Sequence, residues 1–114
     1  MKLCMMSFAL ATDKEWFTVE KMLALTVELK IEYVDFVTLH GREAGELRRM
    51  CDDLGLRVAA HTFQARGLWR SEEEERSKAL DEVRRGCEAA VVLGAPVTMI
   101  PTLAEPSLNR DAFR

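Results

Sequence analysis

Residues 23–41, LALTVELKIEYVDFVTLHG, join the end of an amphipathic helix to a strand. Apolar side chains recur at helical spacing from Met22 to Leu29, so this part predicts a helix with one buried face. Thr18 stands where a helix N-cap is expected. Residues 33–39 then predict a strand, whose end delivers His40 and Gly41.

The strand-then-helix order recurs along the whole chain. The longest helix is expected to start with a capping box of Ser71 and Glu74 and to bury a stripe of Leu80, Val83, Cys87, Ala90 and Val91. Pro96 opens the last strand, where its missing N–H costs nothing. The four strands are expected at residues 3–9, 33–39, 57–63 and 97–100.

This alternation predicts an α/β fold, because parallel strands need crossovers and the crossovers are usually helices. Four strands in 114 residues are half of a (β/α)8 TIM barrel, which typically needs about 250 residues. The chain ends just where a fourth helix would begin. We therefore expect residues 1–114 to be one unit, the N-terminal half of such a barrel, with about four strands, three helices and a parallel sheet, and with the C-terminal half absent.

Composition narrows the class of protein. With 48% hydrophobic and 31% charged residues the chain is globular. A net charge of −3 argues against a nucleic acid or an anionic membrane as the main partner. Cys4, Cys51 and Cys87 are an odd number without CxxC spacing, so buried, reduced thiols in a cytoplasmic protein are expected. The apolar run at residues 3–8 is too short for a signal peptide and is interpreted as a strand.

Three stretches resemble one known family. Residues 23–41 look like the first crossover of the sugar phosphate isomerase/epimerase proteins, the xylose-isomerase-like TIM barrels. LRRMCDDLGLRVAAHTFQA, residues 47–65, is similar to the second helix, turn and third strand of that family, and AAVVLGAPVTMIPT, residues 89–102, resembles the phrase that leads into strand 4. Two residues depart from the family pattern: Asp35 replaces a frequent glutamate and Lys30 a customary glycine.

The resemblance implies an isomerase or epimerase that moves protons between adjacent carbons of a sugar or sugar phosphate. A divalent metal (Mn, Mg, Co or Zn) would serve the intact enzyme, held by Glu, Asp, His and Glu from strands 5 to 8. No metal ligand is carried over to this chain, and residues 1–114 alone are expected to be inactive. The expected partners are a small carbohydrate and further copies of the protein, with no nucleic acid and no membrane.

Candidate site residues follow from the barrel geometry, because catalytic groups lie at the C-terminal ends of the strands. His61, near the end of the third strand, is the expected catalytic residue, and a histidine there can shuttle a proton. The expected substrate-binding residues are Trp16, His40, Gln64 and Trp69. The alternative is structural: hydrogen-bonded histidines inside the fold, and tryptophans that anchor loops.

Other functions stay open. An endonuclease-IV-like, metal-dependent phosphodiesterase of the same superfamily also has a histidine at the end of strand 3, but would want another after strand 4, where Pro101 and Thr102 stand. A non-catalytic, self-associating half-barrel is possible because two sheet edges and one face would be uncovered. The last alternative is a flavodoxin-like binding or signalling module; a phosphoacceptor of this kind would want Asp at the end of strand 3, where His61 stands.

Overall fold

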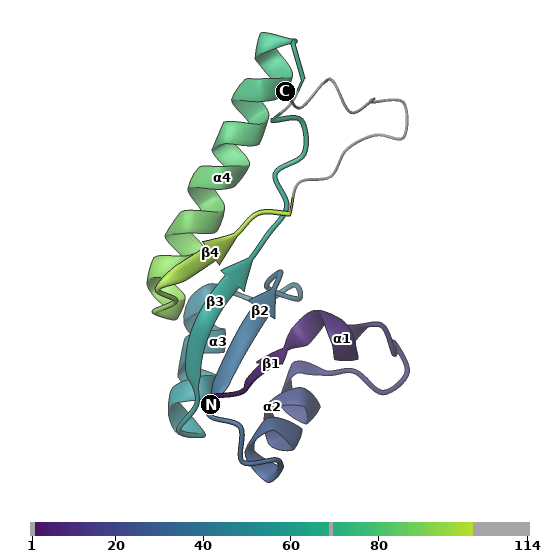
Figure 1. Cartoon of the computed structure of the whole chain (residues 1–114), viewed down its shortest axis with the longest axis vertical. Helices are drawn as coiled ribbons and strands as arrows, with labels where there is room; N and C mark the ends of the chain where they lie inside the picture. The colour runs from purple at the N-terminus through teal and green to yellow at the C-terminus, as the bar shows by residue number, and fades with distance from the viewer. Residues whose placement is uncertain (1, 69, 102–114) are drawn as a thin grey trace.

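The computed structural model describes residues 2–68 and 70–101 (Figure 1). Strands and helices alternate along this part of the chain, as the sequence predicted. Their order is β1 (Cys4–Met6), α1 (Ser7–Ala11), α2 (Val19–Glu28), β2 (Tyr33–Val37), α3 (Ala44–Asp53), β3 (Arg57–Thr62), α4 (Glu73–Leu93) and β4 (Val97–Met99).

All four strands pair in parallel, and their order in the sheet, β1-β2-β3-β4, is their order in the sequence. Val34 of β2 lies beside Met5 on one side and Val58 on the other, which fixes the register. A sequential parallel order is that of a (β/α)8 barrel, whereas a flavodoxin-like sheet places its second strand at the edge, outside the first. The described residues therefore form a partial barrel.

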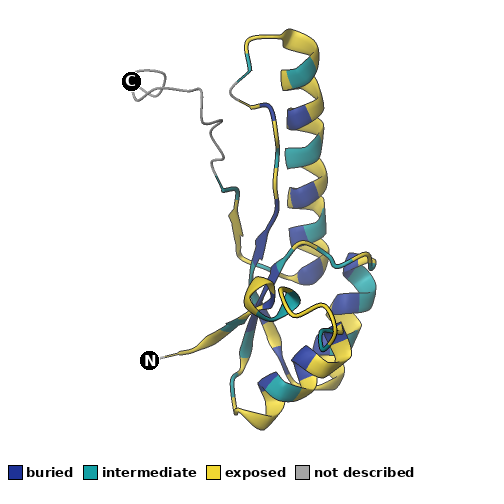
Figure 2. Ribbon diagram, turned by 90° about the vertical axis from the view of Figure 1, so that its right-hand side faces the viewer, coloured by how far each residue is buried: buried dark blue, intermediate teal, exposed yellow. Residues whose placement is uncertain are grey.

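The core lies between the sheet and the helices. Phe36 and Val34 point from β2 into this layer and meet Met22 and Leu23 of α2 and Leu47 of α3, all of them fully buried. Figure 2 shows the longer helices on one side of the strands. The edge strands stay exposed: every residue of β4 is accessible, with Val97 at 57% and Met99 at 47%.

Local chemistry explains two of the helix ends, whereas a third end differs from the prediction. The Thr18 hydroxyl accepts a hydrogen bond from the Lys21 amide at 3.1 Å, so the expected N-cap of α2 is confirmed. Gly94 ends α4 with a φ of +73°, a left-handed conformation that favours glycine. The expected capping box of Ser71 and Glu74 is wrong, because Glu72 is the N-cap residue and no side chain caps the helix.

The first strand is shorter than expected. Residues 3–9 were expected to be strand, but β1 ends at Met6 and α1 begins at Ser7, which adds a fourth helix to the described residues. The Ser7 hydroxyl is fully buried and accepts a hydrogen bond from the amide of Val37, at the end of β2. This bond takes the place of a strand ladder at Ser7, and the chain turns away from the sheet there.

The expected buried stripe of α4 is also wrong in part. Leu80 and Val91 are 59% and 77% exposed, whereas Ala90 is buried as predicted. The helix also buries Ala79, Gly86 and Leu93. The helix approaches the sheet closely at Gly86, which favours small side chains at that point.

Two of the three cysteine thiols also differ from the prediction. Cys51 is buried as expected, but Cys4 and Cys87 are exposed. In the described part of the chain, no helix is both long and apolar enough to cross a membrane.

Candidate functional site

Of the three non-glycine residues with a positive φ among the described residues, two lie directly after β2, and the third is Lys30. Thr38 and His40 have φ values of +67° and +53°, and Gly41 follows with +74°. Non-glycine residues in this left-handed region are uncommon and cost free energy, and such residues cluster at functional sites. These residues lie at the C-terminal end of a parallel strand, where barrel enzymes place their catalytic groups.

The turn brings His40 against Ser7. The Nε2 atom of His40 lies 2.8 Å from the hydroxyl oxygen of Ser7, and this oxygen also accepts the Val37 amide at 2.8 Å. Ser7 directly follows β1, so the pair joins the C-terminal ends of two neighbouring strands. Ser7 is not among the site residues predicted from the sequence. Its signal is a single hydroxyl within the apolar run at residues 3–8.

Aromatic packing completes the surroundings of His40. The ring of Phe17 lies 5.0 Å from the imidazole, centroid to centroid, at an angle of 49°. Partial burial lowers the pKa of His40 below its ordinary value of 6.5, because removing water disfavours the charged ring. Burial therefore favours the neutral form of His40. Among the described residues, the second ring nitrogen, Nδ1, has no hydrogen-bond partner.

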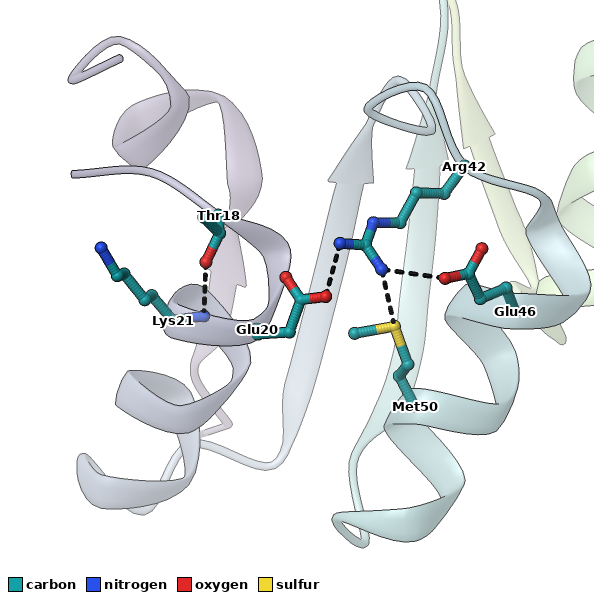
Figure 3. A network of polar contacts seen from close by, with 6 residues as sticks. All are labelled: Thr18, Glu20, Lys21, Arg42, Glu46 and Met50. Carbon is teal, nitrogen blue, oxygen red and sulfur yellow. Dashed lines mark hydrogen bonds and ion pairs between the residues drawn. The ribbon is translucent and has the colours of Figure 1, made fainter. Parts of the chain in front are cut away.

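Arg42 fixes the other end of this loop (Figure 3). Its guanidinium pairs with Glu20 in the first turn of α2 and with Glu46 in the first turn of α3, the latter at 2.8 Å. One of its nitrogens also approaches the sulfur of Met50 at 3.7 Å. Paired carboxylates on two helices hold a planar guanidinium in one orientation. The loop with His40 is thus tied to both α2 and α3.

His61 occupies a different environment. Its Nδ1 atom lies 2.9 Å from the Phe36 carbonyl oxygen, and its ring is 5.4 Å from that of Phe63. His61 is 2% exposed and pairs in register with Phe36, so it lies on the helix-covered side of the sheet. Because a carbonyl only accepts, Nδ1 of His61 is the donor in this bond. The catalytic role of His61 stays a prediction.

The remaining predicted site residues lie in loops. Trp16 is half-buried, and its amide donates to Asp13 at 3.2 Å. Gln64 is exposed, and its side-chain oxygen accepts from Arg66 at 3.2 Å. Within the described ranges, no hydrogen bond joins Trp16 or Gln64 to either histidine. Trp69 lies outside the described residues. The structure thus brings His40 together with Ser7 and Phe17, but not with the other candidates.

A buried carboxylate on the other side of β2 was also missed. The Thr62 hydroxyl donates to Asp35 at 3.2 and 3.4 Å, and both residues are buried. Asp35 alternates with Phe36 along the strand, so it points away from the helices, toward the open side of the sheet. Its signal in the sequence is a lone acid inside an apolar strand.

A cavity of about 510 Å³ lies at the opposite ends of the strands. Tyr33 and Arg57, the first residues of β2 and β3, line it together with Pro96. In a barrel this face contributes to stability, whereas catalysis uses the other face. The cavity therefore does not coincide with the candidate site.

A metal ion does not fit the described residues on their own. Over residues 2–68 and 70–101, no three His, Cys, Asp or Glu side chains gather closely enough to hold one. His40 and His61 each have a single polar side-chain or carbonyl partner instead. We therefore assign this part of the chain no step that passes through a metal.

Three comparisons with known proteins bear on this chain. A family model described as a xylose isomerase-like TIM barrel matches residues 23–113, a stretch that includes β2, β3, β4 and His40. No curated protein and no solved structure matches the chain.

Proposed function

Because the chain belongs to the xylose isomerase-like TIM barrel family, we propose that it supplies the substrate contacts of a sugar or sugar-phosphate isomerase or epimerase. Such an enzyme moves a proton between adjacent carbons, and in the intact enzyme a divalent metal (Mn, Mg, Co or Zn) would assist. The metal ligands and the acid–base carboxylates would come from outside the described residues. We also propose that the protein self-associates.

The observation that carries this proposal is the setting of His40. A neutral imidazole stands at the C-terminal end of β2, with one nitrogen bonded to Ser7 and the other without a partner among the described residues. A strained loop and the Arg42 ion pairs hold it there. A fixed, uncharged ring with one free nitrogen suits hydrogen bonding to a sugar oxygen.

Other residues of the same rim would add to the contact. Trp16 precedes Phe17, which packs on His40, and an indole can cover the apolar face of a sugar ring. Gln64 directly follows Phe63 at the end of β3, and its amide can bond hydroxyl groups. His61 stays the catalytic residue of this proposal, with its Nδ1 bonded to the Phe36 carbonyl and its ring buried on the helix-covered side of the sheet.

Sugar binding tests the proposal directly. We would measure saturation-transfer NMR on the purified chain with a panel of aldoses, ketoses and their phosphates, and with abasic DNA as the competing ligand class. We expect weak sugar binding that His40→Gln and Trp16→Leu reduce severalfold. Arg84→Gln, on the exposed face of α4, is the matched control and should change nothing.

Two results would count against this function. Binding of abasic DNA in preference to every sugar would favour the phosphodiesterase alternative. Sugar signals that stay unchanged in His40→Gln, Trp16→Leu and His61→Gln would show that these residues do not bind the sugar. In the same samples, added divalent ions should give no isomerisation, because the described residues form no metal site.

A further inference from the structure

We propose that Ser7 is a positioning residue that keeps His40 protonated on Nδ1, so that the imidazole offers an N–H donor to a substrate oxygen. The part of this inference that concerns the substrate rests on the proposed function. The part that concerns the tautomer rests on the geometry around Ser7 alone.

The Ser7 hydroxyl has a single proton to donate. The oxygen accepts the Val37 amide at 2.8 Å, which leaves one lone pair and the O–H group for other partners. Two acceptors compete for the O–H: Nε2 of His40 at 2.8 Å and the Val37 carbonyl at 3.4 Å. Hydroxyl hydrogen bonds are normally 2.5 to about 3.0 Å long, so the carbonyl is too far away for a good bond. In the other arrangement, Nε2–H would donate to the remaining lone pair of Ser7, and the O–H would be left with only this long bond to the carbonyl. The arrangement in which the O–H donates to Nε2 makes the better set of hydrogen bonds.

A nitrogen that accepts a hydrogen bond carries no proton of its own. In a neutral imidazole the other nitrogen must then be protonated, which places the proton of His40 on Nδ1. Burial favours the neutral form of the ring. The nearest cation along the loop, Arg42, is paired with Glu20 and Glu46. No carboxylate bonds to the ring among the described residues, so none selects the other tautomer.

The tautomer decides what His40 can do. A ring protonated on Nδ1 donates a hydrogen bond from its free side, and it accepts one only from Ser7. It therefore suits a carbonyl or hydroxyl oxygen of the substrate, and it cannot remove a proton at that nitrogen. Ser7 itself is fully buried, so it reaches no ligand and acts only through His40.

The tautomer can be measured without knowing the substrate. Long-range proton–nitrogen correlation spectra of the ¹⁵N-labelled chain, recorded near pH 8, separate protonated from unprotonated ring nitrogens. His40 and His61 are the only two histidines of the chain, and His40→Gln assigns them. We expect His40 to show a protonated Nδ1 in the wild-type protein. A wild-type His40 that is protonated mainly on Nε2 overturns the inference.

The role of Ser7 needs a variant with an internal control. In Ser7→Ala we expect His40 to shift toward the Nε2-protonated form that a free imidazole prefers, while His61, held by the Phe36 carbonyl, keeps its tautomer. Ser7→Thr retains the hydroxyl and should retain the wild-type pattern. If Ser7→Ala leaves His40 unchanged, Ser7 does not select the tautomer. If that variant does not fold, the wild-type and Ser7→Thr spectra still decide.

Addition of sugars separates this inference from the proposed function. A protonated Nδ1 whose resonance moves when a sugar binds supports both. A protonated Nδ1 that no sugar perturbs contradicts the proposed function and the donor role, while the control of the tautomer by Ser7 stands. Sugar binding to a ring protonated on Nε2 contradicts the inference and leaves the proposed function intact.

Discussion

The aromatic ring of Phe63 lies against the backbone of Gly86, so closely that a Cβ atom at position 86 would stand 2.4 Å from the ring. Phe63 follows β3 directly and Gly86 lies inside α4. The contact therefore packs the longest helix, α4, closely against the end of β3. It also explains why this helix buries small residues.

We predict that Gly86→Ala destabilises the protein by about 1–3 kcal/mol, because the added methyl group overpacks the Phe63 contact. Alanine normally favours a helix over glycine by about 1 kcal/mol, so the sign is the test. Gly45→Ala in α3 is the matched control: its Cβ would meet neighbours only at 3.9 Å, and it should stabilise by up to about 1 kcal/mol. Urea unfolding followed by circular dichroism measures both. Equal effects of the two changes would contradict the packing of α4.

The pKa of His40 predicts a change of stability with pH. Burial lowers this pKa in the folded protein below 6.5, whereas the unfolded chain keeps the ordinary value. Between the two values the unfolded chain binds more protons, so stability should fall as the pH drops through this window and stay constant just above it. His40→Gln should flatten that slope in unfolding curves recorded between about pH 5 and pH 7. An NMR titration of His40 with a midpoint at or above 6.5 would contradict the burial.

The ion pairs of Arg42 predict how firmly the His40 loop is held. Without the guanidinium, the loop after β2 loses its link to Glu20 and Glu46. In Arg42→Gln we expect the amides of residues 39–42 to exchange with solvent severalfold faster in hydrogen-exchange NMR. Arg84→Gln is the control, because its 3.9 Å pair with Asp81 joins only neighbouring turns of α4. Unchanged exchange in the loop, or equal changes in both variants, would show that Arg42 does not hold it.

The sequence predicted the architecture because strand and helix periods are local signals. The apolar run of residues 33–37 and the stripe around Met22 need no knowledge of the rest of the fold. The predicted extent of β1 was wrong because a long-range hydrogen bond between Ser7 and Val37 ends that strand. The contact between Ser7 and His40 could not be predicted for the same reason. It depends on strand register and on left-handed backbone at Thr38 and His40, which no local pattern encodes.

The exposed β4 strand predicts self-association. Val97 and Met99 are about half exposed on an edge strand, and unpaired strand edges pair readily with another copy. We expect the average mass in sedimentation experiments to rise with protein concentration, and Met99→Lys to suppress this rise. Leu80→Lys, at an even more exposed apolar site on α4, is the control. A wild-type chain that stays monomeric throughout, or equal effects of the two variants, would remove β4 as the contact.

We propose above that the C-terminal ends of β1, β2 and β3 form the sugar-binding end of this chain. Amide and imidazole NMR shifts, followed while aldoses, ketoses and their phosphates are added, test it most directly. We predict that the largest shift changes fall on Ser7, His40, Trp16 and Gln64. The residues that line the cavity at the opposite strand ends should show no shift change. Changes centred instead on Tyr33, Arg57 and Gly94, which line that cavity, would contradict the claim.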